Sequence, residues 1–320
     1  YHIDEHYPNA YLVWSLAALS LAWALPSLAH GMLTLVLIFL WSWFEIFDFH
    51  QPNHWAPWLV AAGVIPLAWL QRSNLLLFFS LALFMALYCF TVMRVSEELV
   101  FTSLMLTACA CLAFARLSPL SQFPTSAGAF RVVGIGVYLV LMFIFSFGEL
   151  GGELFGDYPE LLLARVYWGL PLVVASLAWL LVVFRYSQCF QENIERLEAG
   201  LVLVTFLIVA GSSLIPHGIG SWLYFNLIFF LHGCIYVVRG TQLLRWQQTA
   251  LGGLMLSALI FARFMDLFDS LLIRSLAFLL IGAGLFAIGQ LYARRKRHLG
   301  GKGSGQLGEN LSSEERLLKG

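Results

Sequence analysis

The sequence predicts an all-α protein, a polytopic transmembrane helix bundle with about 10–11 spans. Of its 320 residues, 60% are hydrophobic and only 11% are charged, and the mean hydropathy is +0.81. Soluble domains carry about 25% charged residues, so a water-soluble fold would leave too much apolar surface exposed. The formal net charge is zero, and a chain without a strong overall field gives no indication of a nucleic-acid partner.

The last hydrophobic segment, Ser275–Tyr292, sets the expected orientation of the chain. Gln290 is its one strongly polar residue, and the basic run at residues 294–297 follows directly. A helix of this length, rising about 1.5 Å per residue, can cross the hydrocarbon core of a bilayer. Because lysine and arginine beside a membrane helix favour the cytoplasmic side, we expect the C-terminus to be cytoplasmic.

Apolar runs separated by short polar breaks predict the full set of spans. They lie near Tyr11–Leu28, Met32–Phe47, Trp55–Leu70, Leu75–Val92, Leu99–Ala115, Val132–Phe147, Tyr167–Phe184, Gly200–Leu214, Ile219–Val238, Ala250–Met265 and Leu271–Tyr292. The span that contains Pro66 is either a crossing or a re-entrant segment, so ten spans is the alternative to eleven. We expect one transmembrane domain over residues 1–298 and a disordered cytoplasmic tail over residues 299–320.

The basic residues follow the alternation that this topology requires. Counted back from a cytoplasmic C-terminus, the inside loops hold Arg72, Arg116, Arg131, Arg185, Arg196, Arg239 and Arg245 in addition to the basic run. The outside loops hold Arg94, Arg165, Arg263 and Arg274. This excess of positive charge on one side is what the positive-inside rule predicts.

The two ends of the chain resemble a known family. Tyr1-His2-Ile3 precedes a Trp-containing span, and Arg263…Asp266…Arg274-Ser275-Leu276-Ala277-Phe278 leads into the basic end. In these features the chain resembles the bacterial multi-pass membrane proteins grouped as domain-of-unknown-function family 2157. The resemblance implies a bacterial inner (cytoplasmic) membrane and a cytoplasmic N-terminal portion upstream of this chain. It implies no activity and no catalytic residues.

A candidate metal site lies in the outer loop that follows the second span. Its predicted ligands are Glu45, Asp48, His50 and His54, with His2 and His6 as further candidates. Imidazole and carboxylate groups suit zinc and other divalent transition metals. Pro52 argues against a regular helix there, so the ligands would converge from a loop. The alternative is a solvated loop at the level of the lipid headgroups.

Two candidate ligand sites involve the last spans. The first consists of Arg263, Asp266, Asp269 and Arg274. These charges either clamp the final hairpin or form one wall of an anion or proton site. The second consists of Asn226 and His232 in the ninth span, since an ionisable residue inside a bilayer suggests a ligand contact or a proton relay. The alternative is a neutral histidine bonded to a neighbouring helix.

Glycines and cysteines within the spans are expected to serve packing. Gly134, Gly136, Gly282 and Gly284 are predicted to let helices approach closely. The five cysteines show neither disulfide nor zinc spacing.

No catalytic or cofactor motif decides the function, so three hypotheses stay open. The chain carries no phosphate-binding loop, nucleophile elbow or haem-attachment motif, and no cofactor is expected. The favoured hypothesis is a membrane protein, in contact with lipid, that binds or moves a small solute or lipid through the bundle. The first alternative is a non-catalytic scaffold or sensor that works through the upstream portion. The second is an enzyme that acts on a lipid-linked substrate at the outer rim.

Overall fold

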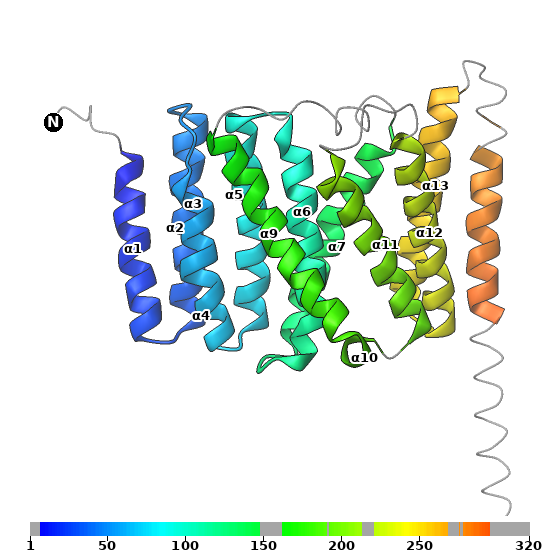
Figure 1. Ribbon diagram of the computed structural model, residues 1–320, viewed down its shortest axis with the longest axis horizontal. Helices are drawn as coiled ribbons and strands as arrows, with labels where there is room; N and C mark the ends of the chain where they lie inside the picture. Colours follow the sequence, from blue (N-terminus) through cyan, green and yellow to red (C-terminus); the bar gives the residue numbers. More distant parts are fainter. Residues whose placement is uncertain are drawn as a thin grey trace, which may run out of the picture. The chain divides into compact units, whose positions relative to one another are not determined.

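The computed structural model describes residues 7–147, 162–190, 192–212, 221–267, 275 and 278–294. Within these ranges the regular elements are helices alone, which confirms the all-α class (Figure 1). In chain order they are α1 (Pro8–Ala24), α2 (Leu28–Phe47), α3 (Trp55–Leu59), η1 (Val60–Val64), α4 (Ile65–Leu70), α5 (Asn74–Val95), α6 (Leu99–Leu117), η2 (Ser118–Leu120), α7 (Ser126–Phe145), α9 (Leu162–Phe184), α10 (Tyr186–Cys189), α11 (Asn193–Ala210), α12 (Ser221–Gln242), α13 (Trp246–Leu267) and a last helix, Phe278–Arg294. The chain divides into two compact units, Tyr1–Phe225 and Asn226–Gly320.

The described residues of the predicted spans are largely helical, although residues 25–27 interrupt the first span and the span Trp55–Leu70 consists of α3, η1 and α4. Six helices in the described part are long and apolar enough to cross a membrane: Leu28–Phe47, Asn74–Val95, Leu99–Leu120, Ser126–Phe145, Ala164–Phe184 and Leu223–Gln242. Two shorter apolar helices are Trp55–Leu70 and Phe278–Arg294. These helices are compatible with a multi-pass membrane protein. The predicted tail, residues 299–320, lies outside the described residues.

Local sequence explains where the first helices begin and end. Pro8 opens α1, where its missing N–H has no partner to lose. Leu25 precedes Pro26 and is extended, with φ −120° and ψ 92°, so α1 ends at Ala24. Before α5, the Ser73 hydroxyl oxygen accepts a hydrogen bond of 3.3 Å from the third residue beyond it, which caps the new helix.

A π-helical turn interrupts the rod formed by α3, η1 and α4. Pro66 has no N–H to donate to the carbonyl of Ala62, and the turn that precedes it is the π-helix η1. The carbonyl of Gly63 within this turn accepts a hydrogen bond of 3.1 Å from Trp23 Nε1 of α1. A Cβ atom at Gly63 would lie 2.8 Å from Leu19 Cδ2, so the glycine permits this close approach.

A second proline interrupts α9, and a neighbouring helix compensates for it. Pro171 lies inside α9 and cannot donate to the carbonyl of Tyr167, four residues earlier. Tyr88 of α5 is fully buried, and its hydroxyl donates to that carbonyl. A side chain of α5 thus supplies the hydrogen bond that the backbone of α9 lacks.

α6 lies at the centre of the first unit, where it packs against α7, α9 and α11. Most of its residues are buried, and many of them are small. A Cβ atom at Gly134 of α7 would lie 3.0 Å from Cys111 Cβ, so α6 and α7 are in close contact. On another face, the indole N–H of Trp179 donates to the carbonyl of Cys109 over 3.2 Å and joins α9 to α6.

The helices of the first unit alternate in direction. The connections α1–α2, α4–α5, α6–α7 and α9–α11 lie at the same end of this unit, the lower end in Figure 1. Arg72, Arg116, Arg131 and Arg185, which were expected in inside loops, lie in these connections or within two turns of them. We refer to this as the arginine-bearing end. Arg94 lies in the last turn of α5, at the opposite end.

In the second unit, α12 and α13 cross at very short distance. A Cβ atom at Gly252 would lie 2.6 Å from both the carbonyl oxygen of Gly233 and the amide nitrogen of Val237. A Cβ atom at Gly240 would lie 2.3 Å from the amide nitrogen of Thr249. Backbone atoms cannot yield as a flexible side chain can, so this crossing requires glycine.

The predicted packing role of the span glycines is only partly confirmed. Gly134 contacts α6 as expected. No described atom lies within 4 Å of the position that a Cβ would take at Gly136, so the prediction is wrong there. For Gly282 and Gly284, whose helix borders residues outside the described ranges, the packing role stays a prediction. All five cysteines are free thiols.

Candidate functional site

A cavity of about 410 Å³ opens at the arginine-bearing end of the first unit, among residues of α6, α7, α9, α10 and α11. Its apolar wall includes Leu112, Ile135, Trp179 and Val202. Its charged and amide side chains are Arg116, Arg131, Gln188, Glu195 and Glu198. Pockets that bind small molecules have volumes of about 300–1,000 Å³ and combine apolar walls with a few polar groups, as this cavity does.

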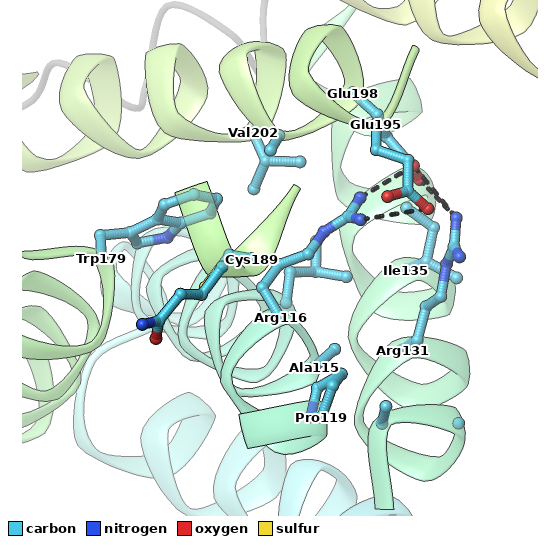
Figure 2. Close-up of a pocket in the computed structure, with 15 residues that line it drawn as sticks. Ala115, Arg116, Pro119, Arg131, Ile135, Trp179, Cys189, Glu195, Glu198 and Val202 are labelled. Atoms are coloured by element: carbon cyan, nitrogen blue, oxygen red, sulfur yellow. Dashed lines mark hydrogen bonds and ion pairs between the residues drawn. The ribbon is translucent and has the colours of Figure 1, made fainter. Parts of the chain in front are cut away.

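Glu198 of α11 is the centre of a charged cluster in this cavity. Its side chain is only 5% exposed. The carboxylate accepts a hydrogen bond of 2.9 Å from Arg116 Nη2 and bonds of 2.9 and 3.0 Å from Arg131 Nη2. Figure 2 shows both guanidinium groups directed at this carboxylate. Two cations from α6 and α7 therefore offset the cost of burying one anion, and the cluster joins three helices.

Glu195 adds a second carboxylate to the cluster. It lies three residues before Glu198 on α11, hence on the same face of that helix. Its Oε1 atom is 3.9 Å from Arg116 Nη1. Side-chain exposure is 16% for Arg116, 21% for Glu195 and 32% for Arg131. The cavity therefore offers a guanidinium and a carboxylate that a solute can reach.

Two residues near α10 complete the surroundings of Arg116. The guanidinium carbon of Arg116 lies 5.6 Å from the ring centroid of Phe190, a cation–π distance. Burial raises the pKa of the Cys189 thiol, although the positive charges of Arg116 and Arg185 oppose this shift. The thiol of Cys189 is therefore protonated at neutral pH and is not an activated nucleophile. The charged side chains of this cavity are suited to binding a ligand.

Two of the predicted metal ligands, Asp48 and His54, have other partners in the structure. Asp48 accepts a hydrogen bond from the Tyr7 hydroxyl, which, with burial and the charge of Asp48, raises the pKa of Tyr7 to about 12. The Nδ1 atom of His54 lies 3.0 Å from the hydroxyl of Tyr167. Burial lowers the pKa of His54.

The described residues hold no group of three or more His, Cys, Asp or Glu side chains suited to a metal ion. The predicted set of Glu45, Asp48, His50 and His54 is thus not gathered into a metal centre there. The further candidates His2 and His6 lie outside the described residues.

The ligand residues predicted near the end of the chain belong to the second unit. His232 of α12 is fully buried, and its Nδ1 atom lies 3.0 Å from the carbonyl oxygen of Ile228, four residues earlier. A carbonyl only accepts, so Nδ1 carries the proton. Asn226 lies on the same helix and is partly exposed. Their role in binding a ligand stays a prediction.

The predicted charged set of the last outer turn is only partly described. Arg263 is partly exposed on α13, and Asp266 lies in the last turn of that helix. Asp269 and Arg274 lie outside the described residues. The clamp and the anion site therefore both stay predictions.

The cluster around Glu198 is not among the sites that the sequence predicts. Sequence patterns place its arginines in inside loops without pairing them with acidic residues. Glu198 meets Arg131 and Arg116 across 67 and 82 residues of sequence. The one local signal is the spacing of Glu195 and Glu198, which places two carboxylates on one helix face beside an apolar span.

No family model, no curated protein and no solved structure matches this chain. The resemblance to domain-of-unknown-function family 2157 therefore stays a prediction.

Proposed function

We propose that the chain is a multi-pass protein of the bacterial inner membrane that binds a small zwitterionic solute or lipid headgroup in the cavity around Glu198. The observation that carries the proposal is the meeting of Arg116, Arg131, Glu195 and Glu198 in one cavity of about 410 Å³. The C-terminus is then cytoplasmic, and the arginine-bearing end faces the cytoplasm, as the positive-inside rule favours.

The chemistry of the cavity supports a ligand with both signs of charge. Arginine binds carboxylate and phosphate groups through its fork of N–H donors, and Arg131 is the more exposed guanidinium of the cluster. Glu195 is the more exposed carboxylate and suits an ammonium group. The apolar wall, with Trp179 and Val202, suits the short carbon skeleton that joins the two charges. Phosphoethanolamine has this chemistry, either free or as the headgroup of phosphatidylethanolamine.

A thermal-unfolding experiment on the purified chain in detergent micelles tests this proposal. Free phosphoethanolamine and phosphatidylethanolamine in the micelle are titrated separately, and tryptophan fluorescence reports unfolding. A ligand at a hundred times its Kd stabilises the folded state by about 2.7 kcal/mol, so we expect a saturable rise in Tm with one of the two. Stabilisation by the free compound identifies a solute site, and stabilisation by the lipid alone identifies a headgroup site.

Two matched variants locate the binding. Arg131→Gln should abolish the rise in Tm that the ligand causes. Arg72→Gln, at the same end but outside the cavity, should retain it. A rise in Tm that survives Arg131→Gln, or the absence of any rise with either compound, would contradict the proposal.

A structural role is the second candidate, because the cluster joins three helices around a carboxylate that is 5% exposed. If the cluster has only this structural role, the cavity has no ligand. Arg131→Gln then lowers the Tm of the ligand-free protein, and neither compound changes the Tm of the unaltered chain.

A further inference from the structure

A second cavity, of about 430 Å³, lies against another face of α6. Residues of α3, η1, α4, α5, α6, α7 and α9 surround it. Its lining is aromatic and aliphatic and includes Trp58, Trp69, Phe84, Phe114 and Leu170. We refer to it as the apolar cleft. The charged cavity uses Leu112, Ala115 and Arg116 of α6, so the two cavities share this helix but not its lining residues.

The hydroxyl groups in the apolar cleft already have partners within the protein. The Tyr88 hydroxyl donates to the carbonyl of Tyr167. The Thr107 hydroxyl donates to the carbonyl of Ser103 over 2.7 Å. An ordered water needs about two to four polar partners, which a lining of this kind does not provide. The chemistry of the cleft therefore favours a hydrocarbon occupant.

Two breaks in regular helix geometry face this cleft. Ala61 belongs to the π-helical turn η1, and Pro171 interrupts α9. Both residues line the cleft. A π-turn and an internal proline each displace a helix from straight packing, which leaves space between neighbouring rods.

The dimensions and access of the cleft match a lipid chain. From Trp58 to Trp69, at about 1.5 Å per residue, the lining follows about 16 Å of the α3–η1–α4 rod. The hydrocarbon core of a bilayer is about 30 Å thick, so this length corresponds to about one leaflet. Leu170 is 45% exposed and Phe114 is 37% exposed, so the cleft is accessible from the surface of the unit.

One end of the cleft lies at the arginine-bearing end of the unit. Trp69 is one residue from the end of α4, and Phe114 lies in the last turn of α6. Phe130 lies in the second turn of α7. All three line the cleft and belong to the arginine-bearing end of the unit. The cleft therefore reaches the arginine-bearing end of the unit, where a chain from the leaflet at that end can enter.

We propose that the apolar cleft binds one acyl chain of a membrane phospholipid from the leaflet at the arginine-bearing end. The chain lies along α4 between α5, α6 and α9, and its terminal methyl group points toward Trp58. This site is separate from the ligand site around Glu198 and does not depend on it.

Photo-crosslinking on the full chain tests the proposal directly. The probe is phosphatidylethanolamine with a diazirine in the middle of one acyl chain, incorporated into vesicles that contain the protein. After irradiation and digestion, we expect crosslinks concentrated on the α4 and α6 residues that line the cleft. Crosslinks spread evenly over the exposed apolar faces of the helices would overturn the proposal.

Two alanines that are adjacent in sequence provide a matched pair of variants. Ala61 lines the cleft, whereas Ala62 is exposed and is not among the lining residues. Ala61→Trp should fill the cleft and reduce the crosslinks there by about tenfold or more, because each methylene that loses its contacts weakens binding. Ala62→Trp should leave them unchanged. Equal crosslinking in the two variants would refute the site.

Two further measurements exclude other causes of a loss of crosslinks, namely a folding defect and binding of the lipid through its headgroup alone. Thermal unfolding shows whether Ala61→Trp is folded. If it is not, Ala110→Leu, a smaller change in the same lining, takes its place with the same expected loss of crosslinks. Arg131→Gln should leave the crosslinks in the cleft unchanged. A loss of crosslinks in Arg131→Gln would mean that the lipid is held through its headgroup in the cavity around Glu198. That result would overturn the proposal of a separate acyl-chain site.

Discussion

Replacement of Tyr88 by phenylalanine tests the hydrogen bond that joins α5 to α9. The change removes one oxygen atom from a fully buried ring and preserves its shape. The carbonyl of Tyr167 then loses the donor that replaces the missing N–H of Pro171. In a membrane-spanning helix no water takes the place of that donor, so the penalty should approach that of an unsatisfied buried carbonyl.

The expected magnitude follows from that penalty. A buried acceptor without a partner costs about 1–3 kcal/mol in the free energy of unfolding. A change of 1 kcal/mol shifts Tm by about 2–4 °C in domains of 150–250 residues. We therefore expect Tyr88→Phe to lower Tm by roughly 2–12 °C, measured by circular dichroism of the purified chain in detergent micelles. Tyr224→Phe, at a tyrosine that is 59% exposed, serves as the control and should shift Tm little.

A double-mutant cycle with Pro171→Ala gives the decisive comparison. The alanine would supply an N–H group to the carbonyl of Tyr167, and the Tyr88 hydroxyl would no longer be needed there. Tyr88→Phe should therefore cost far less in the Pro171→Ala background, with a coupling free energy of about 1–2 kcal/mol. If Tyr88→Phe lowers Tm equally in both backgrounds, the hydroxyl does not compensate for the proline.

Two further predictions concern charge. Glu198→Gln should destabilise the chain by about 3 kcal/mol, because two guanidinium groups lose their carboxylate, whereas the exposed Glu192→Gln should not. Equal Tm values for these two variants would show that the cluster does not stabilise the fold. Burial lowers the pKa of His54, so the unfolded chain binds this proton more readily than the folded one. Stability should therefore fall as pH drops below about 6.5, and His54→Gln should reduce that dependence; an unchanged pH profile would contradict the assignment.

The fold class and the spans can be predicted because their signals are local. The length of an apolar run and its flanking charges are read directly from neighbouring residues. The end of α1 before Pro26 and the start of α5 after Ser73 follow from steric and capping rules that involve only a few positions. Such features do not depend on which helix packs against which.

The site around Glu198 could not be predicted, because its contacts depend on helix packing. The positive-inside rule places Arg116 and Arg131 at the same end, but no local rule joins them to an acid more than sixty residues away. The outer loop shows the same dependence on packing. Residues close in sequence were expected to converge, yet Asp48 bonds to Tyr7 and His54 to Tyr167.

The glycines show the same limit on a smaller scale. Gly134 and Gly136 are two positions apart in one helix, and their neighbours are similar in composition. Only Gly134 faces α6, because two residues correspond to about 200° of rotation around the helix axis. The sequence identifies small residues that permit contact, but the helix face that makes contact is decided by tertiary packing.

The buried position of α6 explains why two cavities of different chemistry lie close to each other. The face with Ala110 and Phe114 borders the apolar cleft, and the face with Ala115 and Arg116 borders the charged cavity. Small side chains along this helix let α7 and α9 approach its backbone. α9 contributes to both cavities, and Trp179 fixes it to α6 through the carbonyl of Cys109. An acyl chain and a zwitterionic ligand would thus bind to different sides of the α6–α9 pair. The acyl chain would have apolar surroundings, and the zwitterionic ligand would have charged ones.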